Sequence, residues 1–409
     1  MLHIHFGAGR LGLGLVAPFF QKPGSELFLL NRAQSGKNET GSTDVAPGRK
    51  AELLREQPDR EYGIQTPGEP VGIREVVKYD EFLTYGPQGI EELAADILRR
   101  SSRKTDGVIV TASVLKASNY HPVVRTLNVI CREKEQGGQI GDVYLVACEN
   151  TVSGHEVLQE DSLQDEISPE TRKHTRCVQA LVDRMCVALE EYPGGEPPIL
   201  HPTVRVRAEE YGSLKLEIQP ETEGLPELCR GSRIEFSRHL AVEKKIKGWL
   251  LNGTHWLIAL TAFQASEGDT GLKLNAYLAA HPERRKFAEQ VLCEISEGIQ
   301  IMLCNDPEYA DFVRDVSPAD YLDGAAKAIL RRFASTEDSI ARILARFRKP
   351  SPEETTTIES FVKRFFDRVD PPIAAYEAEK GFDPPATSHG LLSLCRLLAS
   401  GTFVDSAAA

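Results

Sequence analysis

Leu2-His3-Ile4-His5-Phe6 predicts a short strand, and the glycine-rich segment Gly7-Ala8-Gly9-Arg10-Leu11-Gly12 follows it directly. The second segment fits the pattern G-x-G-x-x-G, in which each glycine has its own steric task. Gly7 permits a tight turn, Gly9 leaves room for a pyrophosphate, and Gly12 lets the next helix pack close to the strand. A strand, this turn and a helix in succession predict a dinucleotide-binding site.

The predicted helix covers residues 11–21. Its first N–H groups are unpaired and its dipole is positive at this end, so the turn can hold phosphate groups. Arg10 and Leu11, where the turn meets the helix, are therefore cofactor-binding candidates. The alternative is a glycine-rich turn with no ligand.

A second strand is predicted over residues 26–30, and it ends in Leu29-Leu30-Asn31-Arg32. An NAD-selective site usually carries Asp or Glu here to bind the ribose 2′-hydroxyl. Asn31 is neutral and Arg32 is a cation, so the 2′-phosphate of NADP meets no repulsion. The pair allows NAD or NADP with a slight preference for NADP, unless Arg32 only covers the adenine or lies in solvent.

Further alternation of strands and helices extends this pattern. We expect a polar loop over residues 34–50, a strand over 107–112, a helix over 121–134 and a strand over 143–148. Thr111 and Ala112, at the end of their strand, are further cofactor-binding candidates. Such alternation is typical of an α/β fold with a Rossmann-type doubly wound sheet.

The proline- and glycine-rich stretch 191–202 marks a predicted domain boundary. Residues 1–195 would form the dinucleotide-binding domain and residues 196–409 a mostly helical substrate and catalytic domain. Strands at 203–208 and 213–218 could instead extend the first sheet. From residue 242 onward the pattern is helical, with breaks near Pro282, Asp306-Pro307 and Pro350.

Charge and cysteine usage exclude several classes of protein. A diffuse net charge of −12 over 409 residues argues against nucleic acid or an anionic membrane as partner, because both require a basic patch, but it leaves room for a local basic pocket that binds a phosphate. None of the eight cysteines forms C-x-x-C, so no metal site is predicted. Buried free thiols in a reducing cytoplasm are favoured over disulfides. No signal peptide and no membrane-spanning run is expected.

A second candidate site is Lys247-Gly248-Trp249-Leu250-Leu251-Asn252-Gly253-Thr254-His255, which has the spacing K-x4-N-x2-H. At about 100° per residue on an α-helix, Lys247, Asn252 and His255 share one broad face. The apolar neighbours would desolvate Lys247 and favour the neutral amine that a general base requires. The alternative is a solvated lysine and a core histidine.

Together these motifs resemble those of the long-chain, metal-independent polyol (mannitol) dehydrogenases. The opening His5-Phe6-Gly7-Ala8-Gly9 is similar to that family's H-F-G-A-G, Ala147-Cys148-Glu149-Asn150 to its A-C-E-N, and Val182-Asp183-Arg184 to a V-D-R element. The K-x4-N-x2-H spacing is the family's catalytic signature. The matches follow the family's order from residue 5 to residue 255.

The resemblance implies a separate role for each residue of the candidate site. Lys247 would take the proton of the substrate hydroxyl, while Asn252 and Asn150 would stabilise the oxygen as it becomes alkoxide-like. His255 would position the substrate, and Asp183 would bind another of its hydroxyls. The substrate implied is a sugar alcohol or a sugar phosphate, and the protein would be a monomer or a weak oligomer.

The chain also departs from the family. Asn31 stands where an acidic residue is typical, and Arg331-Arg332-Phe333-Ala334-Ser335 is only loosely similar to R-F-x-N-P. Arg332 is a substrate-binding candidate, and Arg342, Arg346 and Arg348 could bind a phosphate unless they are exposed helix arginines. A free-polyol or sugar-acid reductase and an inactive NAD(P)-binding regulator are the competing interpretations.

Overall fold

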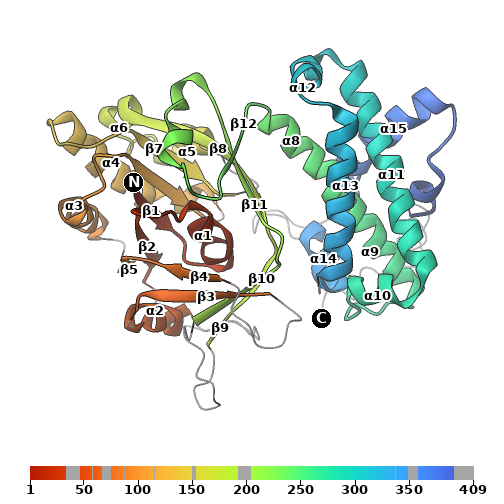
Figure 1. Cartoon of the computed structure of the whole chain (residues 1–409), viewed down its shortest axis with the longest axis horizontal. Helices are drawn as coiled ribbons and strands as arrows, with labels where there is room; N and C mark the ends of the chain where they lie inside the picture. The colour runs from red at the N-terminus through yellow and green to blue at the C-terminus, as the bar shows by residue number, and fades with distance from the viewer. Residues whose placement is uncertain are drawn as a thin grey trace. The chain divides into compact units, whose positions relative to one another are not determined.

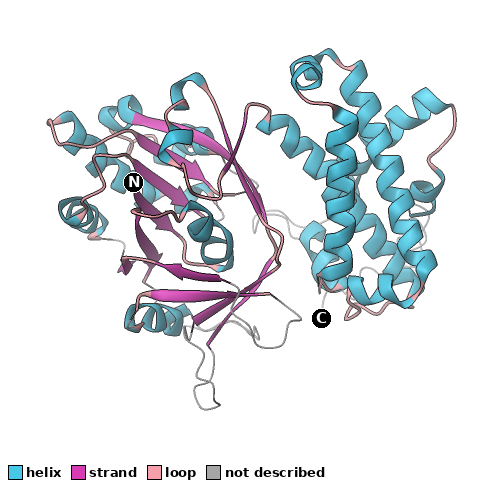
Figure 2. Cartoon of the chain, in the orientation of Figure 1, coloured by secondary structure: helices cyan, strands magenta, loops and turns pink. Residues whose placement is uncertain are grey.

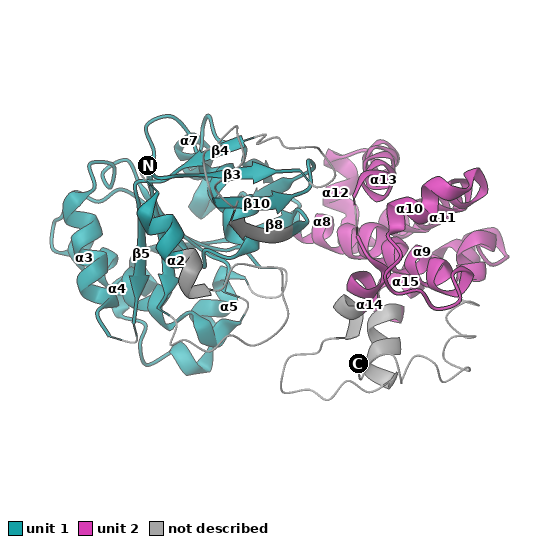
Figure 3. Ribbon diagram, turned by 90° about the horizontal axis from the view of Figure 1, so that it is seen from below, with its two compact units in different colours: residues 1–240 teal, residues 241–409 magenta. Residues whose placement is uncertain are grey.

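The computed structural model describes residues 1–33, 47–57, 59–66, 75–86, 88–114, 116–149, 153–191, 204–336, 338–348 and 358–390. The chain divides into two compact units, Met1–Leu240 and Ala241–Ala409 (Figure 3). Strands lie in the first unit, whereas the described part of the second is built from helices (Figure 2).

The main sheet of the first unit has eight strands in the order β12-β11-β8-β7-β6-β1-β2-β5 (Figure 1). Their bounds are β1 Leu2–Phe6, β2 Glu26–Arg32, β5 Glu81–Tyr85, β6 Val108–Ala112, β7 Val143–Ala147, β8 Thr175–Asp183, β11 Ser213–Glu217 and β12 Glu235–Ser237. The six strands from β5 to β8 are parallel, and β11 pairs antiparallel with β8. Numbered along the chain, the six have the order 3-2-1-4-5-6 of the Rossmann fold, which confirms the predicted fold class.

Helices cover both faces of this sheet because its parallel strands are apolar on both sides. The helices α3 (Ile90–Arg100), α4 (His121–Glu135) and α5 (Gly154–Gln159) pack on one face, where Leu2, Ile4 and Phe6 contribute to the core. On the other face lie η1 (Gly12–Val16), α1 (Ala17–Phe20) and α7 (Leu225–Leu228).

A second sheet of four strands has the order β4-β3-β10-β9. Its strands are β3 Glu61–Gln65, β4 Glu75–Lys78, β9 Cys186–Glu191 and β10 Val204–Ala208. Tyr62 and Val206 of this sheet pack against Leu13 and Ala17, and the Tyr62 hydroxyl donates to the Leu13 carbonyl at 2.7 Å. This sheet therefore supports the helix that follows the glycine turn.

The two strands beyond residue 200 serve different sheets. Residues 204–208 join the second sheet and residues 213–217 extend the main one. For this reason the first compact unit continues to Leu240, past the boundary at residue 195 that the sequence suggests.

The helices of the second unit are α8 Leu240–Ile246, η5 Lys247–Gly253, α9 Thr254–Ala265, α10 Leu274–Ala280, α11 Pro282–Asn305, α12 Ala310–Asp315, α13 Pro318–Ser335, α14 Ile340–Arg348 and α15 Ile358–Lys380. The predicted breaks at Pro282 and Pro307 are confirmed, and Pro350 lies outside the described residues. Trp256, which is fully buried, packs in one apolar core with residues of α11, α13 and α15.

Two local predictions are corrected by the structure. Residues 47–50 belong to α2 (Pro47–Glu56) and not to a loop, while residues 34–46 lie outside the described part. Cys131, Cys148, Cys177 and Cys229 are buried free thiols as predicted, but Cys293 and Cys304 are exposed. Among the described residues, no helix combines the length and apolar character needed to cross a bilayer.

Candidate functional site

The glycine turn has the geometry that its sequence predicts. Gly7 has a φ of +97°, and a Cβ added there would lie 2.4 Å from the Ser113 carbonyl oxygen. A Cβ at Gly12 would lie 2.2 Å from the Gly7 carbonyl oxygen, whereas a Cβ at Gly9 would meet only that same oxygen, at 3.9 Å. The fold therefore requires glycine at 7 and 12, and Gly9 borders open space that a bound phosphate can use.

The helix after the turn begins as a π-helix, η1, with i→i+5 hydrogen bonds. Arg10 is exposed and Leu11 half-buried at its start. Arg184, of the predicted V-D-R element, donates from Nη1 to the Gly14 carbonyl oxygen at 2.6 Å and from Nε to the Glu209 carbonyl oxygen at 2.9 Å. The conspicuous role of this element is thus to anchor the helix of the glycine turn.

β1 and β6 are neighbours, but the chain leaves them toward opposite faces of the sheet, so the carboxyl edge between them is the switch point where α/β folds bind ligands. Ser113, just past β6, donates its hydroxyl to the Gly7 carbonyl oxygen at 3.1 Å. Thr111 and Ala112 are fully buried within β6. From β6 and the residue after it, Ser113 is thus a side chain in contact with the turn, and the sequence does not single it out.

A chain of buried hydrogen bonds underlies the turn. The Thr111 hydroxyl lies 2.8 Å from His3 Nε2 and 2.7 Å from His5 Nδ1, and His5 Nε2 lies 3.2 Å from the Gly7 carbonyl oxygen. Burial lowers the pKa of His5 to about 4, although the bond to Gly7 acts in the opposite direction. Burial, and secondarily the charge that His5 would carry, holds the pKa of His3 well below its usual value.

This network predicts an acid-sensitive fold. A histidine with a lowered folded-state pKa stabilises the protein fully above its unfolded value of 6.5, and this contribution is lost as the pH falls toward about 4. For His5 the full loss is about 3 kcal/mol. The free energy of unfolding, measured with urea, should differ less between pH 8 and pH 5 in His5→Asn than in wild type. His281→Asn, at an exposed site, is the control and should keep the wild-type difference between the two pH values. If His5→Asn keeps the same difference as this control, the assignment is wrong.

The other cofactor-binding and substrate-binding candidates of the first unit lie at the same carboxyl edge. The Gly7 N–H donates to the Leu30 carbonyl oxygen at 3.0 Å, which brings the half-buried Asn31 and the exposed Arg32 next to the glycine turn. Asp183 is half-buried at the end of β8. Asn150 lies outside the described residues, and its neighbour Glu149 is buried just past β7.

In the second unit, the sequence predicts a regular α-helix for the K-x4-N-x2-H segment, and the structure differs. Residues Lys247–Gly253 form the π-helix η5, and α9 begins at Thr254. In a π-helix the backbone hydrogen bonds join residues i and i+5. Lys247 and Asn252 have this spacing, so both belong to the same wide turn. His255 follows on α9, three residues after Asn252.

Burial separates Lys247 and Lys244, which are half-buried, from Lys245. Lys247 is half-buried, and Trp249, Leu250 and Leu251 beside it are buried. Lys245, by contrast, is exposed and bonded to Glu308 at 2.6 Å, which raises the pKa of its amine. The three lysines at 244, 245 and 247 therefore do not form one solvated face.

His255 is enclosed by residues of α13 and by the residues that lead into α14. Its ring stacks on Phe333 with centroids 4.6 Å apart and an interplanar angle of 18°, and its Nε2 lies 3.7 Å from Asp338 Oδ2. Arg332, half-buried, precedes Phe333, so the R-F element reaches the candidate site through its aromatic ring. The sequence does not single out Phe333 or Asp338, and only the R-F pair gives a signal for them.

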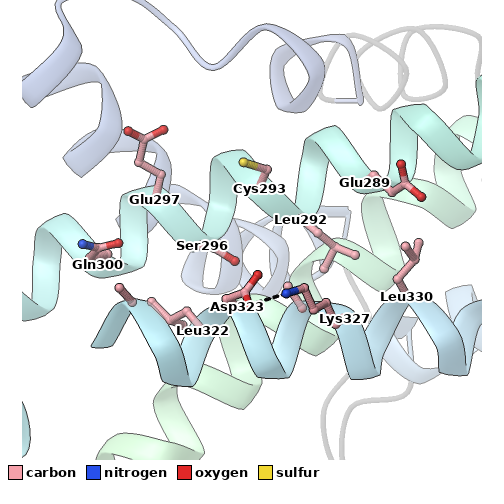
Figure 4. Close-up of a pocket in the computed structure, with 12 residues that line it drawn as sticks. Glu289, Leu292, Cys293, Ser296, Glu297, Gln300, Leu322, Asp323, Lys327 and Leu330 are labelled. Carbon is pink, nitrogen blue, oxygen red and sulfur yellow. Dashed lines mark hydrogen bonds and ion pairs between the residues drawn. The ribbon is translucent and has the colours of Figure 1, made fainter. Parts of the chain in front are cut away.

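A hollow of about 550 Å³ lies elsewhere in this unit, between α11 and α13. Ser296 points from α11 toward α13, where Asp323 and Lys327 pair with each other (Figure 4). Glu297 pairs with Lys380. Because these charges are neutralised locally, the hollow presents no converging charge for a ligand.

No protein-family model matches the chain, and comparison with curated protein sequences gives no match. Solved structures do match. D-sorbitol dehydrogenase is similar at a TM-score of 0.60 and 14% identity over 97% of this chain and 80% of its own. Mannitol 2-dehydrogenase from Pseudomonas fluorescens, solved with NAD and D-mannitol, has a TM-score of 0.51 and 12% identity over 96% of this chain and 77% of its own. The chain thus has the fold of these polyol dehydrogenases.

Proposed function

We propose that this protein is an NAD(P)-dependent oxidoreductase that interconverts a secondary alcohol of a hexitol or hexitol phosphate and the corresponding ketose. The observation that carries the proposal is the π-helical segment Lys247–Gly253, in which Lys247 and Asn252 stand at the i and i+5 positions, in a chain whose first unit has a dinucleotide-type glycine turn. The shared fold with two polyol dehydrogenases supports it.

The residues present fit a nicotinamide dinucleotide. The open space at Gly9 and the N–H groups that begin η1 would hold the pyrophosphate, and the ends of β2 and β6 would border the adenosine and nicotinamide portions. When bound, the nicotinamide would supply a hydride acceptor or donor. All other steps fall to side chains of the chain.

Lys247 would be the acid–base group in this reaction. During oxidation it takes the proton of the substrate hydroxyl, and during reduction it returns a proton to the carbonyl oxygen. Asn252 and Asn150 donate hydrogen bonds to that oxygen as negative charge develops on it. His255 orients the substrate, and Asp183 and Arg332 bind its remaining polar groups.

Within the polyol dehydrogenases, the motifs are most similar to those of mannitol-1-phosphate 5-dehydrogenase, so we infer a phosphorylated substrate. The test is nicotinamide absorbance with fructose 6-phosphate, fructose and several keto acids, each with NADH and NADPH. Fructose 6-phosphate should be reduced fastest. Preference for fructose or a keto acid would contradict the phosphate inference, and no turnover with any of them would contradict the proposed activity.

Asn31 and Arg32 lead us to propose a slight preference for NADP. Asn31→Asp should shift the ratio of kcat/KM values from NADP toward NAD, because a carboxylate binds the ribose 2′-hydroxyl and repels a 2′-phosphate. Both reduced cofactors are compared at saturating substrate. Asn31→Gln, which keeps the site neutral, should leave the ratio unchanged. If Asp and Gln give the same ratio, Asn31 does not select the cofactor.

A further inference from the structure

The segment that leads into α14 is held by backbone hydrogen bonds as well as by its side chains. The Asp338 carbonyl oxygen accepts from the Leu274 N–H at 2.9 Å, and the Ile340 N–H donates to the Leu272 carbonyl oxygen at 3.0 Å. An antiparallel bridge joins Lys273 and Ser339 between these bonds. The backbone of Asp338 is therefore hydrogen-bonded to the segment that leads into α10 (Leu274–Ala280).

The buried carboxylate of Asp338 connects two other side chains. Its Oδ1 accepts from Arg342 Nε at 2.6 Å, one helical turn further on, and its Oδ2 lies 3.7 Å from His255 Nε2. The exposed fraction of the Asp338 side chain is 4% and that of His255 is 13%. At 3.7 Å the contact with His255 is too long for a hydrogen bond, so the carboxylate acts on the imidazole through its charge.

Arg342 explains how a carboxylate can be buried here. A buried ion pair persists only where further contacts compensate both charges. Arg342 meets Oδ1, which leaves Oδ2 as the atom turned toward the imidazole. Phe333 fixes the plane of that imidazole by stacking on it. Both the direction and the tilt of the His255 ring are thus set by residues outside the K-x4-N-x2-H motif.

We propose that Asp338, held by Arg342, is a positioning residue that keeps the proton of His255 on Nε2 and leaves Nδ1 as the acceptor atom of the ring. A carboxylate beside one ring nitrogen favours the tautomer that carries its proton on that nitrogen. An Nδ1 acceptor suits a substrate that offers a hydroxyl donor beside the reacting carbon. This last step rests on the proposed polyol dehydrogenase function, whereas the tautomer does not.

A double-mutant cycle tests whether Asp338 acts through His255. Asp338→Asn should lower kcat/KM by about tenfold, in the range usual for residues that orient an active group. In a His255→Asn background the same change should have no further effect. The control is Asp323→Asn, which removes the i,i+4 ion pair of Asp323 with Lys327 on α13 and should leave kcat/KM unchanged. Losses that add in the double variant would overturn the proposal, because they would indicate two independent roles.

The tautomer itself is read by nitrogen NMR of ¹⁵N-histidine-labelled protein, without substrate or turnover. The signal that disappears in His255→Asn belongs to His255, and in wild type it should report an Nε2–H tautomer. In Asp338→Asn it should become a mixture. An Nδ1–H tautomer in wild type would overturn the proposal even in an active enzyme, and this result requires no folded Asp338 variant. The expected tautomer without turnover on any polyol would contradict only the proposed function.

Discussion

Lys247→Ala is expected to bind NADH and NADPH with nearly wild-type affinity and to lose at least about 10²-fold in turnover. A positioned acid–base group contributes about 10²–10⁴-fold to a proton-transfer step, and alanine cannot replace the amine. The proposed cofactor site is the glycine turn of the first unit, which this substitution does not alter. Fluorescence titration of the reduced cofactors and steady-state turnover measure the two effects separately.

Lys245→Ala is the matched control. Lys245 lies two residues earlier, is exposed, and pairs with Glu308, so its loss should leave turnover unchanged. An exposed ion pair of this kind contributes little to stability. Unchanged turnover in Lys247→Ala, or equal losses in both variants, would show that Lys247 is not the acid–base group.

Gly9→Ala is expected to raise the dissociation constant of the cofactor at least about tenfold while leaving the folded protein nearly as stable as wild type. A Cβ at this position would meet only the Gly7 carbonyl oxygen, at 3.9 Å, so the fold accommodates it. The methyl group would instead occupy the space reserved for the pyrophosphate. Titration with NADH and NADPH gives the dissociation constant, and urea unfolding gives the stability.

Gly12→Ala, by contrast, should lower the stability of the fold itself. We expect a loss of about 1–3 kcal/mol, a typical cost of overpacking. Its Cβ would lie 2.2 Å from the Gly7 carbonyl oxygen and 2.3 Å from His5 Nε2. Gly324→Ala, in an open position on α13, is the neutral control. If Gly9→Ala binds cofactor normally, this turn is not where the pyrophosphate lies.

The Rossmann core could be predicted because its signals are local. The glycine turn, the apolar run of β6 and the amphipathic α4 each depend on a few neighbouring residues, and all lie where expected. The four-stranded sheet could not be predicted, because β3 pairs with β10 more than a hundred residues away. Short strands such as β3 acquire their partners from tertiary packing, which leaves little trace in local sequence.

The candidate site shows the same division. Lys247, Asn252 and His255 are recognisable from their spacing. This spacing does not distinguish a π-helix from an α-helix, so the angles between the three side chains that an α-helix predicts do not apply. Asp338 and Ser113 could not be found, since each is a single polar residue whose contacts come from distant segments. The segment also packs closely on α15, since a Cβ added at Gly253 would lie 3.0 Å from the Arg368 carbonyl oxygen, and no spacing rule reveals such a neighbour.

The widened turn at Lys247–Gly253 also bears on which changes in chain length the segment can accept. Removing one residue between the two candidates, for example Gly248, would leave Lys247 and Asn252 four residues apart, a spacing that shares one face of an ordinary α-helix. The segment could therefore close as an α-helix and still keep the amine and the amide on one side. A single deletion here is for that reason expected to be less damaging than the loss of either side chain.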